Sequence, residues 1–279
     1  MAARPLSAPG WAEARAKLAS PLFAPLAPAL AKLPADRWPS LDELTAAAQA
    51  AATARGKPVR FVSPRAAADK GRRPYELHIA QTGEVETRPE NWHDLFNALA
   101  WIAFPRAKAR INAQHAAILE EGGEEEARRR GPERDALTLF DEGGVVVASS
   151  APDLLRLIVE HDWKTLFWHR RAELEARMAF FAFGHALHEK ALDPYLGIVA
   201  KTVFVPVDEL FFRLPHEAQV ERADALAAAH FAERSRFRTP KAMPVLPVLG
   251  IPGWHPGTSR ESFYDDPDYF RGRPGAGEA

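Results

Sequence analysis

The chain of 279 residues contains no cysteine. A disulfide framework, a zinc–thiolate site and a thiol nucleophile are therefore excluded. A chain of this length can build its core without disulfides, and 47% of its residues are hydrophobic, which is ordinary for a globular protein. Because the absence of cysteine fits a reducing compartment, we predict a cytoplasmic protein.

The chain also lacks an excess of charge and a long apolar run. Lys and Arg total 36 against 37 Asp and Glu, for a net charge of -1. Nucleic-acid binders carry a basic footprint, so no nucleic-acid partner is predicted. No apolar run reaches the roughly 20 residues of a membrane span, and Pro21, Pro25 and Pro28 interrupt the most apolar N-terminal stretch. We therefore expect neither a membrane segment nor a signal peptide.

Composition divides the chain into three regions. Residues 1–38 are rich in Ala and Pro and are predicted to be irregular, apart from a short helical piece at 11–18. Residues 39–238 are predicted to form a single α+β domain, and residues 239–279 a Pro/Gly/aromatic arm packed on that domain. The expected fold is mainly helical, with a small antiparallel sheet built from hairpins and covered by helices. Regular β-α-β alternation is missing, which argues against a doubly wound fold.

Local signals place the elements. Ser40 and Glu43 form a capping box at the start of a helix, and a charged loop is expected at 120–135. The helices are expected at 40–56, 92–104, 105–121, 152–161, 163–192 and 216–237. Strands are expected at 58–63 and 202–207, with hairpins formed by 75–79 with 84–88 and by 136–140 with 145–149. A basic loop is expected at 64–73.

Two histidines continue an apolar stripe of the helix expected at 163–192. The stripe, at spacings of three and four, consists of Leu174, Met178, Phe181, His185, His188 and Leu192. Glu189 lies at the edge of the same face. Buried imidazoles need partners, and two interpretations stay open. The histidines bind a metal or act as acid and base, or they are core residues bonded to carbonyls and carboxylates.

Two further groups contain residues able to do chemistry. His93 and Asn97 lie four residues apart at the start of a helix, with Asp94 able to stabilise that helix start instead of acting in chemistry. Asp141 and Glu142 form a carboxylate pair at the expected hairpin turn, where carboxylates are also common for local reasons. The pair matters only if the fold brings it to one of the histidines.

These groups define two candidate sets and two functions. The candidate catalytic residues are His93, Asp94, His185 and Glu189, and the candidate metal ligands are His185, His188, Asp141 and Glu142. The first hypothesis is a hydrolase that depends on a metal or on a His/carboxylate pair, with one divalent ion such as Zn, Mn or Fe as cofactor and an unidentified small-molecule substrate. The second is a non-catalytic binding or protein-interaction module with structural core histidines.

Several familiar motifs are missing. The chain has no GxxxxGK[ST] or GxGxxG phosphate-binding loop, no GxSxG nucleophile elbow and no zincin motif. None of the common nucleotide-binding or serine-hydrolase sites is therefore predicted.

Four long motifs point to a family. They are NWHDLFNALAWIAFPRAKARINAQH, LTLFDEGG, FGHALHEKALDPYLGIVAKT and GIPGWHPGTSRESFYDD. Together they resemble the bacterial Domain of Unknown Function 3025 family, from about residue 75 to residue 270. The resemblance implies a bacterial origin and one full-length domain. It carries no assigned activity, so it implies no role for any residue.

Overall fold

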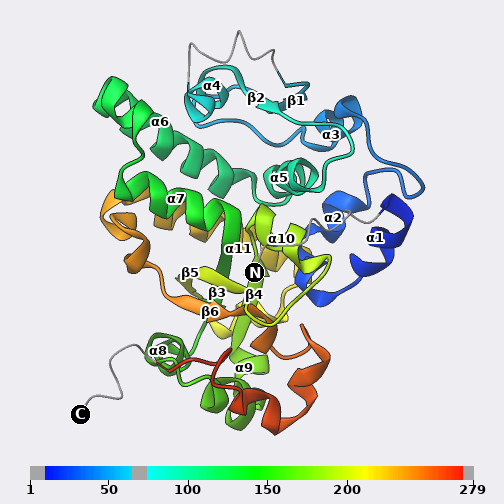
Figure 1. Ribbon diagram of the computed structural model, residues 1–279, viewed down its shortest axis with the longest axis vertical. Coiled ribbons are helices and arrows are strands. Elements are labelled where there is room, and N and C mark those ends of the chain that lie inside the picture. Colours follow the sequence, from blue (N-terminus) through cyan, green and yellow to red (C-terminus); the bar gives the residue numbers. More distant parts are fainter. Residues whose placement is uncertain (1–9, 65–73, 273–279) are drawn as a thin grey trace.

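A mixed four-stranded sheet lies near the middle of the molecule (Figure 1). The structure is a computed structural model and describes residues 10–64 and 74–272. The strands are β3 (Gly144–Ser149), β4 (Met178–Ala182), β5 (Val199–Pro206) and β6 (Val245–Pro247), in the order β4-β3-β5-β6. The pair β3–β5 is parallel, and the pairs β3–β4 and β5–β6 are antiparallel. The fold is α+β and mainly helical, as predicted, but the sheet is not purely antiparallel.

The sequence of β3 suits a central strand. All six residues of GVVVAS are buried, because helices or chain segments cover both faces of the sheet. Valine is β-branched and packs well on a pleated surface. A run that is apolar on both faces is typical of a strand enclosed on both sides.

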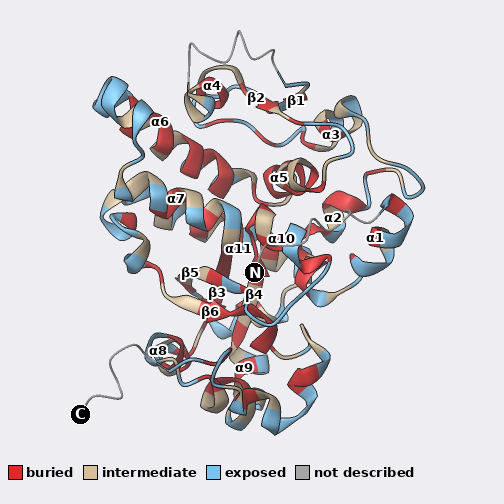
Figure 2. Ribbon diagram, viewed as in Figure 1, coloured by how far each residue is buried: buried red, intermediate tan, exposed pale blue. Residues whose placement is uncertain are grey.

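Helices cover both faces of this sheet. Figure 1 shows one group above the sheet and a second group, with the C-terminal segment, below it. The first group is α5 (Trp92–Ala103), α6 (Pro105–Arg128), α7 (Pro132–Gly143), α10 (His185–Ala191) and α11 (His216–Ala232). The second group contains α8 (Pro152–Glu160) and α9 (Arg171–Arg177). Buried residues lie along α5, α6 and the sheet (Figure 2).

The N-terminal third builds a layer next to α5. Its elements are α1 (Trp11–Lys17), a 3₁₀ helix η1 (Pro21–Leu26), α2 (Ala27–Leu30), α3 (Leu41–Ala47), β1 (Arg60–Val62), α4 (Tyr75–Thr82) and β2 (Glu84–Glu86). The irregular segment expected at 1–38 thus contains three short helices within its described part. Their apolar residues, such as Phe23 and Leu26, are buried in the same core as α5, because an Ala/Pro-rich stretch with regularly placed large apolar residues can still pack.

The C-terminal segment packs on the body of the protein through aromatic residues. Tyr264, Tyr269 and Phe270 are buried. The hydroxyl of Tyr269 donates to the carbonyl of Ile198 at 2.8 Å and accepts from the amide of Leu249 at 2.8 Å. The predicted division of the chain at residues 39 and 239 stays a prediction.

Both predicted hairpins are wrong. Residues 75–82 form α4, which ends at Gly83 with φ 77°, and β1 pairs with β2 in parallel. Residues 136–140 belong to α7, where Ala136, Leu137 and Phe140 are buried at helical spacing. An apolar run of five residues has no period long enough to separate a strand from a helix. The expected basic loop lies, apart from residue 64, outside the described residues.

The helix expected at 163–192 is also wrong. The segment forms a π-helical turn (Thr165–His169), then α9, β4 and α10. Met178 to Ala182 leave the helix because they pair with β3 in the sheet. The expected loop at 120–135 is mostly helix, since α6 continues to Arg128 and α7 begins at Pro132.

Helix starts were predicted more accurately. The capping box of α3 is present, with the Ser40 hydroxyl accepting from the Glu43 amide at 3.2 Å, although α3 ends at Ala47 and not near residue 56. Asn91 caps α5 by accepting from the amide of Asp94 at 3.0 Å, and α6 begins at Pro105 as expected. Within residues 10–64 and 74–272, every helix is too short or too polar to cross a bilayer.

Candidate functional site

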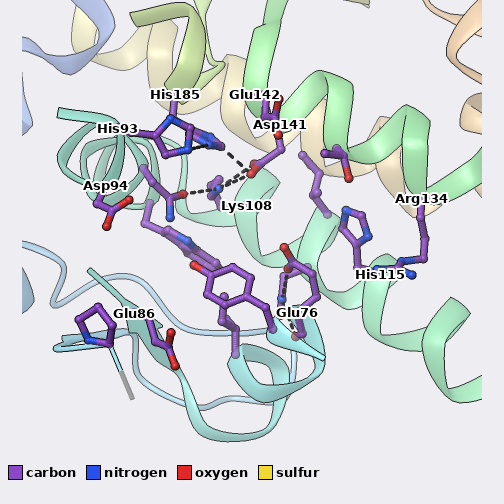
Figure 3. Close-up of a pocket in the computed structure, with 18 of the residues that line it drawn as sticks. Glu76, Glu86, His93, Asp94, Lys108, His115, Arg134, Asp141, Glu142 and His185 are labelled. Carbon is purple, nitrogen blue, oxygen red and sulfur yellow. Dashed lines mark hydrogen bonds and ion pairs between the residues drawn. The ribbon is translucent and has the colours of Figure 1, made fainter. Parts of the chain in front are cut away.

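A polar pocket of about 470 Å³ is formed by α4, α5, α6, α7 and α10 (Figure 3). Its ionisable side chains, besides Tyr75, are Glu76, Glu86, Arg88, His93, Asp94, Lys108, His115, Arg130, Arg134, Asp141, Glu142 and His185. A concave pocket that gathers so many titratable groups is the usual setting for catalysis or ligand binding.

Four side chains form a series of contacts at one edge of the pocket, where three of them line it and Glu189 lies just outside the lining. His93 Nδ1 lies 2.9 Å from Glu189 Oε2, and His93 Nε2 lies 3.1 Å from His185 Nε2. The two rings meet edge to face, with centroids 4.5 Å apart. His185 Nδ1 in turn lies 3.6 Å from Asp141 Oδ2. We call Glu189, His93, His185 and Asp141 the histidine relay.

The contacts of the histidine relay restrict where its protons sit. One Nε2 atom must donate to the other, and His93 Nδ1 donates to Glu189. His185 Nδ1 faces Asp141 but makes no hydrogen bond to any residue that the structure describes. The hydrogen bond with Glu189 raises the pKa of His93. Burial lowers the pKa of His185 to about 4. His93 is therefore the more readily protonated of the two rings, and His185 is neutral near pH 7.

Replacing Glu189 tests this proton assignment. In a Glu189→Gln variant the pKa of His93 should fall, because the carboxylate that stabilises its imidazolium is gone. NMR titration of the histidine ring protons measures the shift. Glu175→Gln, at an exposed position of α9, is the matched control and should leave His93 unchanged. An unaltered His93 pKa in the Glu189 variant would contradict the assignment.

Asp141 is held in place by a buried lysine. Lys108 Nζ donates to Asp141 Oδ1 at 2.7 Å and Oδ2 at 2.9 Å, and to Asn97 Oδ1 at 2.8 Å. Burial acts to raise the pKa of Asp141, but the charge of Lys108 outweighs it, and the pKa is below its ordinary value. Asp141 is therefore an ionised partner for His185.

Close packing of α7 against α10 brings Asp141 to His185. A side chain at Gly184, the residue before α10, would place its Cβ 2.4 Å from the carbonyl oxygen of Glu142. The amides of Phe183 and Gly184 both donate to the carbonyl of Gly144 at 3.0 Å. Only glycine permits this approach, so the position of His185 depends on Gly184.

Asp94, a predicted catalytic residue, lines the pocket but is engaged locally. Its carboxylate accepts from the Arg88 amide at 2.7 Å and from the Arg88 guanidinium at 2.8 and 2.9 Å. Burial acts to raise the pKa of Asp94, and the hydrogen bonds of Arg88 outweigh it, so the pKa is lowered. These bonds, with the Asn91 cap, fix the first turn of α5 and so the position of His93.

His188 does not face the pocket. Its ring is fully buried and packs against Phe23 and Phe96, with centroids 5.7 and 5.6 Å away. Its Nδ1 donates to the carbonyl of Gly184 at 2.8 Å. The predicted stripe is lost upstream because Met178 and Phe181 belong to β4. Within α10, His185 lines the pocket and His188 does not.

The predicted metal ligands are therefore not brought together as a set. Asp141 and His185 belong to the histidine relay, Glu142 is an exposed side chain of the pocket lining, and His188 is a core residue. Among the described residues, no group of three or more histidines, aspartates and glutamates is arranged to hold a metal ion.

Sequence reasoning missed a second row of pocket residues on α6. Lys108, Asn112 and His115 are spaced four and three apart, and each is at most 4% exposed. No sequence signal marked them, because α6 carries many other polar residues, such as Arg106, Arg110 and Gln114, and polar residues at helical spacing are also typical of a solvated face. Tyr75 and Arg134 carried no signal either.

The family comparison covers this whole site. The model of a family described as "Protein of unknown function (DUF3025)" matches residues 59–273, which is more than half of the chain. The chain belongs to the DUF3025 family. No curated protein and no solved structure matches it. The DUF3025 match includes every member of the histidine relay, and its description assigns none of them a role.

Proposed function

We propose that this DUF3025 protein is a hydrolase-like enzyme that acts on a small polar molecule by general acid–base catalysis. The observation that carries the proposal is the contact between His93 and His185 at the edge of the pocket, backed at both ends by a carboxylate. Two titratable groups whose surroundings push their pKa values apart are suited to the roles of acid and base. Here His93 is the acid and His185 is the base.

The proposed reaction uses one water molecule. A substrate entering the pocket separates the two Nε2 atoms, and His185 removes a proton from water as the oxygen bonds to the electrophilic carbon. His93 gives its Nε2 proton to the leaving group as the bond to that group breaks. When the rings meet again, the proton passes from His185 to His93, and the starting state is restored. Glu189 and Asp141 orient the rings.

Model substrates test the proposal. Hydrolysis of p-nitrophenyl acetate, p-nitrophenyl hemisuccinate and a p-nitroanilide should be followed by absorbance for the wild type, His93→Gln and His185→Gln. General acid–base catalysis contributes about 10²–10⁴-fold, so each variant should lose about that factor in kcat/KM. The exposed His169 provides the control, and His169→Gln should retain the wild-type rate.

Two outcomes would contradict the proposal. One is turnover that is equal in the wild type and in both relay variants. The other is purified protein that holds a stoichiometric divalent ion, shown by elemental analysis, and loses it on replacement of His93 or His185. The rings would then be ligands and not an acid–base pair. Binding of Zn, Mn or Fe to the protein stays a prediction that the same analysis checks.

A non-catalytic binding module is the second candidate. The observation in its favour is His188, which is a core histidine bonded to a backbone carbonyl, as that hypothesis expects. Equal turnover in all variants, together with a protein partner that co-purifies, would favour it. A bacterial origin and a cytoplasmic location also stay as proposals, supported by the resemblance and by the absence of cysteine.

A further inference from the structure

The side of the pocket formed by α6 and the start of α7 carries polar groups that have no use in the histidine relay. His115 is only 3% exposed and lines the pocket, and within the described residues no hydrogen bond reaches its ring. Arg134 lines the pocket beside it, as Figure 3 shows. A buried polar group without a partner is costly, and one explanation for it is a ligand that binds there.

The two arginines there have donors to spare. Arg134 donates through one terminal nitrogen to the carbonyl of Glu126 at 2.7 Å and pairs through the same nitrogen with the Glu126 carboxylate at 3.4 Å. Its other terminal nitrogen makes no hydrogen bond within the described residues. Arg130 also lines the pocket, and its ion pair with Asp135 is long at 3.9 Å. A guanidinium with free donors is suited to bind a planar or tetrahedral oxyanion.

The acidic groups on this side are already engaged. Glu76 accepts from the amide of Asn112 through Oε2 at 2.7 Å and through its carbonyl at 2.9 Å. Glu126 accepts from the amide of Gly131 at 2.8 Å and, through the same oxygen, from Arg134 at 3.4 Å. These bonds occupy both carboxylates and leave the second terminal nitrogen of Arg134 for a ligand.

We infer that Arg134, Arg130 and His115 form a subsite for an oxyanion, a carboxylate or a phosphate, carried by the substrate. The inference rests on the proposed function, since the bond to be cleaved would lie at the histidine relay while the anionic group is held across the same pocket. The substrate class is thus a small molecule with an anionic group at one end and a hydrolysable bond at the other.

Titration with simple anions tests the subsite. Inorganic phosphate and acetate should each be added to the wild type at pH 7 and followed by isothermal titration calorimetry. At least one should bind, and the tighter of the two identifies the anionic group. Arg134→Gln should weaken that binding at least tenfold and Arg130→Gln several-fold. Arg128→Gln, at an exposed residue paired with Glu124 outside the pocket, should leave it unchanged.

The outcomes separate the subsite from the proposed function. The inference is overturned if neither anion binds the wild type, or if Arg134→Gln binds as tightly as the wild type. Should Arg134→Gln fail to fold, Arg134→Lys replaces it, since it keeps the charge but loses the guanidinium fork and should also bind more weakly. Anion binding that survives in His185→Gln without any ester turnover in the wild type supports the subsite and rejects the acid–base enzyme.

Discussion

Replacing Lys108 by Met should lower the free energy of unfolding by about 3–5 kcal/mol, because it leaves the carboxylate of Asp141 buried without its cation. The side chain of Lys108 is 5% exposed and that of Asp141 is 17% exposed. At such sites the attraction between the charges offsets their loss of hydration only while both are present. Urea denaturation followed by circular dichroism measures the change.

A double-mutant cycle isolates the pair. Lys108→Met combined with Asp141→Asn removes both charges together, so its loss of stability should be clearly smaller than the sum of the two single losses. Lys190→Met, at an exposed lysine of α10, is the matched control and should change stability by less than about 0.5 kcal/mol. A loss below about 1 kcal/mol for Lys108→Met would show that Asp141 is not held as a buried ion.

Acidification should destabilise the protein steeply below pH 6.5. Burial lowers the pKa of His188 from 6.5 to about 3 and that of His185 from 6.5 to about 4, and it also lowers the pKa of His115. Between pH 6.5 and pH 4, His185 and His188 are therefore protonated in the unfolded chain and neutral in the folded chain. The contribution of these histidines is present above pH 6.5 and is lost as the pH falls, by about 1.4 kcal/mol per pH unit each for His185 and His188 until the pH reaches the folded pKa.

His188→Phe tests the largest of these contributions. The ring packs against both Phe23 and Phe96, so phenylalanine extends an aromatic cluster but cannot take up a proton. Between pH 6.5 and pH 4 the stability of this variant should fall less steeply than that of the wild type, by about 1.4 kcal/mol per pH unit. The control is His169→Gln, at an exposed position. Parallel stability curves for the wild type and His188→Phe would contradict the burial of a neutral imidazole.

The sequence predicted helix starts better than whole elements. Ser40, Asn91 and Pro105 act through contacts within one helical turn, so their signals are complete in a few letters. The strand at 178–182 was missed because Met178 and Phe181 also suit a helix stripe, and only pairing with β3 decides between the two. The same ambiguity explains why strands of hairpins were predicted within two segments, 75–82 and 132–143, that form helices.

The candidate site was predicted in composition but not in arrangement. His93, His185, Glu189 and Asp141 were all named as candidates from sequence, and the structure brings these four together. Their catalytic roles stay predictions. His188 was grouped with His185 by spacing alone. Within α10 the ring of His188 packs in the core against Phe23 and Phe96, while His185 lines the pocket.

The sequence by itself determined local and compositional features. These are an α+β fold class, the absence of thiol chemistry, several helix caps and a short set of titratable candidates for a functional site. Only the tertiary structure decided which of them meet. The contact of His93 with Glu189 spans 96 positions and that of Lys108 with Asp141 spans 33. Such contacts depend on how α5, α6, α7 and α10 pack around one pocket. That packing results from the burial of apolar residues across the whole core. A stretch of a few residues does not contain the information that specifies it.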